Sequence, residues 1–194
     1  DNSVYLIGGS NPEFDDDKIY NTSFVFDNTG KEIAYHRKMH LFDIDIEGGQ
    51  KFKESDSLTA GDKVTTFSVE IKHDNSDPTT DKNENKLNTN KSNIIIGLCI
   101  CFDFRFPELS RLMVERGATL LVVPASFNMT TGPMHWELMF RQRAVDNQCF
   151  TVGVSPARDI NGLYVSYGNS IVVSPWGEVI YRADEKETVA VVDI

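Results

Sequence analysis

The segment that decides the fold is IIIGLCICFD, residues Ile94–Asp103. Residues 94–100 are apolar or glycine without interruption, which is typical of a strand that is covered on both faces. A helix follows, opened by Pro107 and closed by Gly117. The apolar residues on one face of that helix are Leu109, Leu112 and Met113. A second apolar run, Leu120–Val123, completes a strand–helix–strand unit.

Strands, turns and one more helix flank this unit along the chain. Apolar or alternating runs predict strands at Val4–Ile7, Thr22–Asp27, Lys31–Arg37, Thr65–Ile71, Phe150–Val154, Ser170–Ser174, Val179–Arg182 and Val189–Ile194. Gly8-Gly9 predicts a turn after the first strand, and Asn28-Thr29-Gly30 predicts a hairpin between the second and third. The second helix is predicted from Pro133 to Asn147. Hairpins beside strand–helix–strand units indicate an α/β (α+β) layered sandwich with a mixed sheet.

The segment at residues 72–93 differs in composition from everything around it. It is rich in Asn, Lys and Asp, and Leu87 is its one large aliphatic residue. Such a segment cannot bury enough apolar area to offset the entropy of ordering it. We therefore expect a long, mobile surface loop inserted between two strands, and we favour an inert insertion over a binding role.

Charge and composition argue against two classes of partner. The chain has 194 residues, with 19 Lys and Arg against 29 Asp and Glu, giving a net charge of -10. An acidic protein repels a phosphate backbone, so we do not expect nucleic acid as a partner. No apolar run approaches the roughly 18 residues of a membrane span, so no membrane partner is expected. The three cysteines are too few, and odd in number, for a secreted disulfide scaffold, which favours a reducing compartment.

Both ends of the chain lie next to apolar runs that read as core strands. The sequence starts at Asp1, without Met, shortly before Val4–Ile7, and stops at Ile194 directly after residues 189–192. We expect a piece of a longer protein, cut at both ends. A targeting peptide would then lie outside this sequence.

Cys101 follows the apolar strand at residues 94–100 and precedes the helix at Pro107. A thiol on a tight strand-to-helix connection is held at the edge of a sheet, and a nearby helix N-terminus favours its thiolate. This is the geometry of a nucleophile. The alternative is a buried cysteine that packs as a small apolar residue. Cys99 points the same way but deeper, so we assign it to the core, and its C-x-C spacing with Cys101 is not a zinc pattern.

Lys38 lies at the end of a predicted strand, in the block His36–Asp43. The aromatic and apolar residues after it could bury its stem. A buried lysine near a thiol would stabilise both the thiolate and a developing oxyanion. The alternative is a solvent-facing lysine at a strand end, the commoner position for this residue type.

Three blocks together carry a resemblance to a known family. They are His36–Asp43, the segment around Cys101, and Thr130–Glu137, the second half of a cluster that begins at a strand end at Pro124 and runs into a helix. In this order they resemble the signature blocks of amidases of the nitrilase superfamily, the carbon–nitrogen hydrolases. Ser155–Asp159 and Asn169–Glu178 also resemble that family, and its ω-amidase branch in particular. The resemblance implies one partial domain over residues 1–194, a four-layer αββα sandwich, and pairing into homodimers.

The resemblance also implies roles for individual residues. Cys101 matches the nucleophile, Lys38 the triad lysine and Glu54 a supporting glutamate. The backbone N–H of Phe102 would help Lys38 to stabilise the oxyanion. The general-base glutamate of the triad lies, in family members, upstream of the strand with which this sequence begins. The chemistry requires no cofactor and no metal.

The expected substrate is a small amide. Enzymes of the ω-amidase branch act on α-keto acid amides such as α-ketoglutaramate, whose carboxylate needs a cationic partner. Arg105 is the expected clamp, and its alternative role is an ion pair with Glu108. Phe127 and Thr131 are expected to line the same pocket. Alternative functions are an amidase for deaminated glutathione and a non-catalytic binding module, and the expected compartment is the cytoplasm or the mitochondrion.

Overall fold

The computed structural model describes residues 4–45, 47, 51–72 and 91–194, and within them the strands form a large, a small and a two-stranded sheet. The large sheet contains β6 (Thr65–Lys72), β7 (Lys91–Leu98), β8 (Leu120–Pro124), β9 (Phe150–Val154), β10 (Ile171–Val173) and β11 (Val179–Arg182). The small sheet contains β1 (Leu6–Asp15), β2 (Lys18–Phe26) and β3 (Glu32–Arg37), and the two-stranded sheet β4 (Asp43–Asp45) and β5 (Lys51–Lys53). The helices are α1 (Pro107–Glu115), α2 (Gly132–Asn147) and the 3-10 turns η1 (Glu54–Asp56) and η2 (Cys101–Arg105).

The centre of the large sheet is parallel because helices connect its strands. The strand order is β11-β10-β9-β8-β7-β6. α1 lies between β7 and β8 along the chain and α2 between β8 and β9, as a crossover between parallel strands requires. The register pairs Leu98 with Val122 and Pro124 with Val154. The carboxyl ends of β7, β8 and β9 therefore meet at one edge of the sheet, where α/β proteins place their sites.

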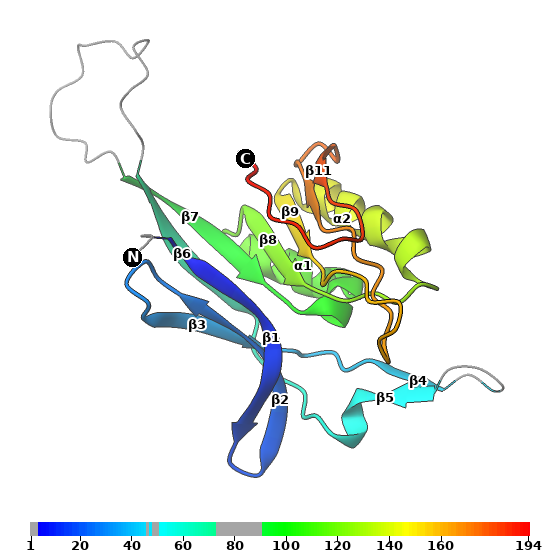
Figure 1. Ribbon diagram of the computed structural model, residues 1–194. Helices are drawn as coiled ribbons and strands as arrows, with labels where there is room; N and C mark the ends of the chain where they lie inside the picture. Colours follow the sequence, from blue (N-terminus) through cyan, green and yellow to red (C-terminus); the bar gives the residue numbers. More distant parts are fainter. Residues whose placement is uncertain (1–3, 46, 48–50, 73–90) are drawn as a thin grey trace, which may run out of the picture.

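The large sheet is covered on both faces (Figure 1). On one face, α1 and α2 bury residues such as Met113, Trp136 and Phe140 against the sheet. On the other face, Val25 of the small sheet packs in a cluster with Val69 and Leu98. β8 is buried along its whole length, as expected for a strand between two layers. The α/β sandwich predicted from the sequence is confirmed. The described residues form one helical layer, made of α1 and α2, and two sheet layers, the large sheet and the small sheet.

Most of the predicted elements are present. The hairpin around Asn28-Thr29-Gly30 joins β2 and β3, and both predicted helices form, opened by Pro107 and Pro133. α2 ends at Gln148, whose left-handed backbone (φ 52°) closes the helix in place of a glycine. The predicted apolar face of α1 is too wide, because Leu112 is 43% exposed. None of the helices among the described residues is long and apolar enough to cross a membrane.

The turn predicted at Gly8-Gly9 is wrong. Both glycines lie inside β1, where the pairing with β2 shifts register between Ile7 and Ser10. A glycine pair accommodates such a bulge as readily as it does a turn. The chain reverses instead after Asp15, where Asp16 has φ 51°.

Two predictions at other chain segments also need correction. The strand predicted at Val189–Ile194 is wrong, because this segment pairs with no strand of the described residues and leaves Val189 and Val191 exposed. The loop predicted at residues 72–93 is too long at both ends. Residues 70–72 of β6 pair with residues 91–93 of β7, and residues 73–90 lie outside the described residues.

Candidate active site

A cavity of about 550 Å³ lies at the edge where β7, β8 and β9 end. It is lined by residues from the small sheet, the two-stranded sheet and the loops that follow the three strands. Every site residue named from the sequence reaches this cavity: Lys38, Glu54, Cys101, Phe102, Arg105, Phe127 and Thr131. The fold thus brings together residues that lie up to about a hundred positions apart in the chain.

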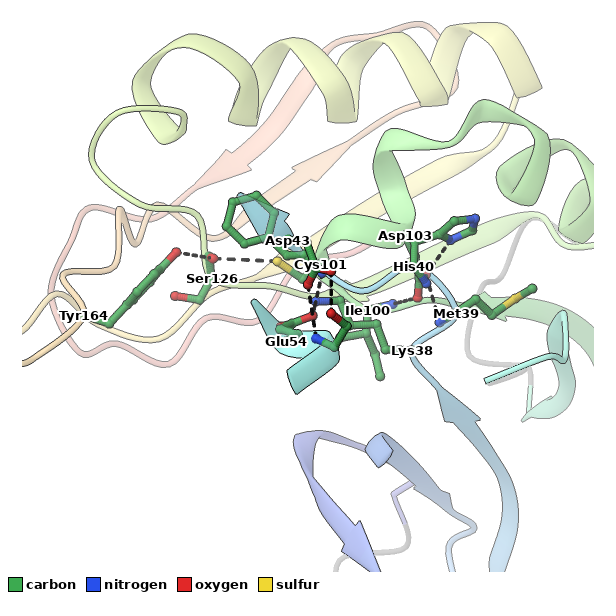
Figure 2. A network of polar contacts seen from close by, with 12 residues as sticks. Lys38, Met39, His40, Asp43, Glu54, Ile100, Cys101, Asp103, Ser126 and Tyr164 are labelled. Carbon is green, nitrogen blue, oxygen red and sulfur yellow. Dashed lines mark hydrogen bonds and ion pairs between the residues drawn. The ribbon is translucent and has the colours of Figure 1, made fainter. Parts of the chain in front are cut away.

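Cys101 occupies a strained turn. Its φ of 48° is in the left-handed region, which costs a non-glycine residue on the order of 1–3 kcal/mol. The half-buried side chain faces the cavity, and the thiol donates a hydrogen bond to the carbonyl oxygen of Ser126 at 3.7 Å (Figure 2). A strained turn after a strand, with its side chain held at the sheet edge, is the geometry of a nucleophile.

Burial acts against the thiolate of Cys101. It raises the pKa of the Cys101 thiol above its usual range, and the neighbouring Lys38 ammonium opposes this only in part. The thiol therefore keeps its proton near neutral pH. The element after Cys101 is the short 3-10 turn η2, whose dipole is too small to offset burial. A thiol in this state needs a base before it can attack.

Lys38 and Glu54 form a buried ion pair beside the thiol. Lys38 is 1% exposed, and its Nζ donates to Oε2 of Glu54 at 2.5 Å. The same carboxylate oxygen accepts the backbone N–H of Phe42 at 2.8 Å. Glu54 begins η1, directly after β5, so the two-stranded sheet carries the partner of Lys38 into the cavity. The alternative of a solvent-facing lysine is excluded by this burial.

Arg105 reaches the cavity from the end of η2. Its Nη2 lies 3.1 Å from Nδ1 of His135, and its guanidinium stands 5.2 Å from the centre of the Phe127 ring. Burial lowers the pKa of the Arg105 guanidinium, which nevertheless stays charged near neutral pH. The ion pair with Glu108 considered from the sequence is not formed among the described residues, where His135 contacts Arg105 instead.

Phe127 and Thr131 lie in the loop between β8 and α2. Phe127 is buried and packs edge-on against Trp136, with 5.1 Å between ring centres. The hydroxyl of Thr131 donates to Oδ1 of Asn128 at 3.0 Å, and so does its backbone N–H at 2.8 Å. These contacts hold the loop as one wall of the cavity.

Tyr164 belongs to the site although no sequence motif indicates it. Its hydroxyl donates at 2.8 Å to the Ser126 carbonyl, the group that also accepts from the Cys101 thiol (Figure 2). Burial raises the pKa of Tyr164 to about 12, so the hydroxyl remains a donor at neutral pH. The loop that carries it is tied to the loop after β8 by the bridge between Asn128 and Ser166. No local pattern marks Tyr164, because only this pairing of two loops brings it to the cavity.

Asp103 is a second residue whose place the sequence did not reveal. Its carboxylate is fully buried and accepts hydrogen bonds from the chain around His36–His40 and from Ile100. Burial alone would raise the pKa of Asp103, but the bonds from His36 and Ile100 lower it, so the group is a carboxylate. The two histidines thus serve this carboxylate, and the described residues contain no group of three or more His, Cys, Asp or Glu that could hold a metal.

Cys99 and Cys149 are buried away from the cavity surface. Burial places the pKa of Cys99 well above its usual range and raises that of Cys149 to about 11. All three cysteines are free. The assignment of Cys99 to the core is confirmed by its place in the helix–sheet cluster.

The sequence is similar to several known proteins. The chain matches the family model described as carbon–nitrogen hydrolase over residues 1–194. A hydrolase from Schizosaccharomyces pombe is 46% identical over 194 residues, which are 100% of this chain and 53% of that protein. The Omega-amidase NIT2 of Mus musculus is 45% identical over 194 residues, 100% of this chain and 62% of that protein. The chain therefore spans less than two thirds of the length of these relatives.

Solved structures show the same fold. The crystal structure of Saccharomyces cerevisiae Nit3, a member of branch 10 of the nitrilase superfamily, superposes with a TM-score of 0.75 at 40% sequence identity. The match covers 96% of this chain and 58% of that chain. The NitFhit protein of C. elegans gives a TM-score of 0.74 at 32% identity, covering 95% of this chain and 40% of that one.

Proposed function

The chain belongs to the carbon–nitrogen hydrolase family, and from that membership we propose that the protein is a thiol-dependent amidase of the ω-amidase type. The reaction is hydrolysis of the terminal amide of a small α-keto acid amide, similar to α-ketoglutaramate, to the carboxylate and ammonia. One observation carries the proposal. The thiol of Cys101 shares a cavity with the buried ion pair of Lys38 and Glu54.

The first step is removal of the thiol proton. Because burial keeps Cys101 protonated, attack on the amide carbonyl requires a general base. The resemblance to the family assigns this role to the general-base glutamate of the triad. The base takes the proton as the sulfur–carbon bond forms, and it later returns that proton to the leaving nitrogen.

Lys38 and the backbone N–H of Phe102 stabilise the tetrahedral oxyanion. The ammonium of Lys38 is already placed by Glu54, so little reorganisation is needed as negative charge develops. Ammonia leaves when the carbon–nitrogen bond breaks and a thioester remains on Cys101. Water, deprotonated by the same base, attacks the thioester, and the carboxylate and the free thiol are released.

Arg105 selects a substrate with a carboxylate. Among the residues that line the cavity, the cationic side chains are Arg105 and Lys38. Lys38 is already paired with Glu54, which leaves Arg105 to bind a carboxylate. Phe127 and Thr131 complete this end of the pocket. A carboxylate bound by Arg105 would hold the amide of a short keto acid at the thiol. The similarity to relatives named omega-amidase supports amidase activity.

Ammonia release from α-ketoglutaramate by the full-length protein tests the proposal. We expect release by the wild type, none by Cys101→Ala, and unchanged release by Cys149→Ala, which removes a buried thiol outside the cavity. A folded wild type that releases no ammonia would refute this substrate. A wider amide panel that includes deaminated glutathione would then separate an amidase of different specificity from a non-catalytic binding module.

We also propose a homodimer and a reducing compartment. The outer face of α2 exposes large apolar side chains, which supports pairing through the helices. The free cysteines support a reducing compartment, the cytoplasm or alternatively the mitochondrion.

A further inference from the structure

The carboxylate of Asp103 connects the two segments that carry the proposed chemistry. On one side, Oδ1 accepts the backbone N–H of Met39 at 3.1 Å, the backbone N–H of His40 at 2.8 Å and Nδ1–H of His40 at 2.8 Å. On the other side, Oδ2 accepts the backbone N–H of Ile100 at 3.0 Å and Nε2–H of His36 at 3.0 Å. Figure 2 shows the part of this network that Asp103 forms with Met39, His40 and Ile100, beside Lys38 and Cys101.

The donors flank both proposed catalytic groups in the chain. Lys38 lies between His36 and Met39, and Cys101 directly follows Ile100. The backbone N–H of Asp103 in turn donates to the carbonyl of Ile100 at 3.0 Å, so the turn that holds Cys101 is closed from both ends. The ring of His36 is itself fixed by Thr65, whose Oγ1 lies 3.0 Å from Nδ1.

We propose that Asp103 is a positioning residue for the amidase reaction, fixing the Cys101 thiol relative to the Lys38 ammonium. The inference rests on the proposed function. Asp103 does not touch the cavity, since it is absent from the residues that line it. Asp103 acts through the two backbone segments that donate hydrogen bonds to it. A buried carboxylate whose acceptor positions are all used holds such segments rigidly.

The electrostatic effect of Asp103 on the Cys101 thiol would oppose the reaction. The negative charge of Asp103 lies close enough to Cys101 to disfavour the thiolate, and so to raise the pKa of the thiol. Loss of that charge should therefore make the thiol easier to ionise. If geometry is what matters, removal of the carboxylate should slow hydrolysis while it leaves the thiol at least as reactive.

Asp103→Asn in the full-length protein separates these effects. An amide can accept on one side but presents N–H groups on the other, so it must release either Ile100 or the Met39–His40 segment. We expect kcat for α-ketoglutaramate to fall on the order of 10²-fold, since a displacement of about 1 Å has that effect. KM should change by less than about threefold, because the interaction lost is one that acts in the transition state.

The second measurement is alkylation of Cys101 by iodoacetamide, followed by mass spectrometry of the cysteine peptides. The rate at Cys101 should equal or exceed that of the wild type at fixed pH. Cys99 and Cys149, which are buried, report any unfolding as new alkylation. Slower hydrolysis with undiminished alkylation at Cys101 and none at the other two supports positioning. Equal loss of both reactions overturns it.

A milder variant and a control guard against a fold defect. His40→Phe keeps the stacking on Phe106, where the ring centres are 3.7 Å apart, and removes the side-chain donor to Oδ1. It should lower kcat by a few-fold with KM unchanged. Asp27→Asn is the matched control, because that carboxylate also accepts several bonds, from Thr29 and Lys31, in a hairpin away from the cavity.

The outcomes distinguish the two proposals. No ammonia release by the wild type refutes the proposed function. An active wild type together with an Asp103→Asn variant of normal kcat refutes the positioning role alone. An equal loss of kcat in Asp27→Asn would refute it as well.

Discussion

At the scale of the residue, the site holds a protonated thiol next to a paired ammonium. Burial dominates the pKa of Cys101, and Lys38 opposes it. We expect the rate of iodoacetamide alkylation at Cys101 to rise with pH and to reach half its maximum above the ordinary thiol pKa of about 8.5. Lys38→Met should move this midpoint further upward, because it removes the charge that favours the thiolate. A midpoint at or below that of a free cysteine peptide would contradict the burial that the structure shows.

Arg105 tests the substrate at the same scale. Lysine keeps the charge but loses the planar fork that binds a carboxylate through two hydrogen bonds. Arg105→Lys should therefore raise KM for α-ketoglutaramate by about tenfold, the effect of roughly 1.4 kcal/mol, with little change for an amide that lacks the carboxylate. Steady-state kinetics on the two substrates measures this. An equal rise for both would remove Arg105 as the clamp.

The residues at the cavity could be named from the sequence only in part. Cys101 and Lys38 lie in short blocks that resemble the family, and Glu54 matches a supporting glutamate of the family by its position, so their meeting could be anticipated. Tyr164 could not, since it arrives through a loop that is tied down by a bridge between residues 128 and 166. The role of Asp103 depends on donors more than sixty positions earlier, and no local pattern records such contacts.

At the scale of the element, the sequence correctly predicts the helices and turns that depend on interactions between near neighbours in the chain. The α2 helix and the hairpin between β2 and β3 were predicted because proline, glycine and apolar spacing act over a few residues. The turn predicted at Gly8-Gly9 is wrong because glycine is favoured in a β-bulge as well as in a turn. Residues 189–194 misled because β-propensity makes a strand only where a neighbouring strand is available.

Helix α1 contains a fully buried hydroxyl group, that of Ser110. The buried hydroxyl of Ser110 has no hydrogen-bond partner among the described residues, whereas the equally buried hydroxyl of Thr151 donates to the carbonyl of Phe140 at 3.0 Å. Removing an unsatisfied polar group recovers its desolvation cost, while removing a satisfied one loses a bond. Ser110→Ala should thus leave the free energy of unfolding unchanged or raise it by up to about 1 kcal/mol.

Thr151→Val is the matched variant for this comparison. It should lower the free energy of unfolding by about 1–2 kcal/mol, because the Phe140 carbonyl loses its side-chain donor. Urea denaturation of both variants, at equal m-values, measures the difference. A Ser110→Ala variant that is destabilised as much as Thr151→Val would show that the hydroxyl has a partner, such as a buried water.

At the scale of the whole molecule, the cavity exists because three sets of strands meet. β7, β8 and β9 end at one edge, the small sheet covers the face behind them, and the two-stranded sheet brings Glu54 (Figure 1). Layering could be predicted from the order of strands and helices, since parallel strands need helical crossovers. The packing of the small sheet on the large one could not be predicted. It depends on apolar contacts between segments far apart in the chain, such as those in the cluster that contains Val25 and Leu98.

The proposed pairing of two copies also belongs to this scale. The outer face of α2 exposes Met134 at 70% and Leu138 at 61%, and the turn after β10 adds Trp176 at 90%. These residues border one shallow groove, so they form a single patch. A patch of large apolar side chains on a helix suits a second copy of the chain, because a twofold axis buries the same patch twice.

Leu138→Glu tests this assembly. Because the twofold axis places the new charge on both copies, the dissociation constant of the dimer should rise by at least about 30-fold, the effect of roughly 2 kcal/mol at a hot spot. Light scattering coupled to size exclusion, over a range of concentrations of the full-length protein, measures it. Phe14→Glu is the control, since Phe14 is also a large exposed apolar residue, at 77%, but lies on the hairpin of β1 and β2. A wild type that is monomeric throughout, or a Leu138→Glu variant that remains dimeric, would refute pairing through α2.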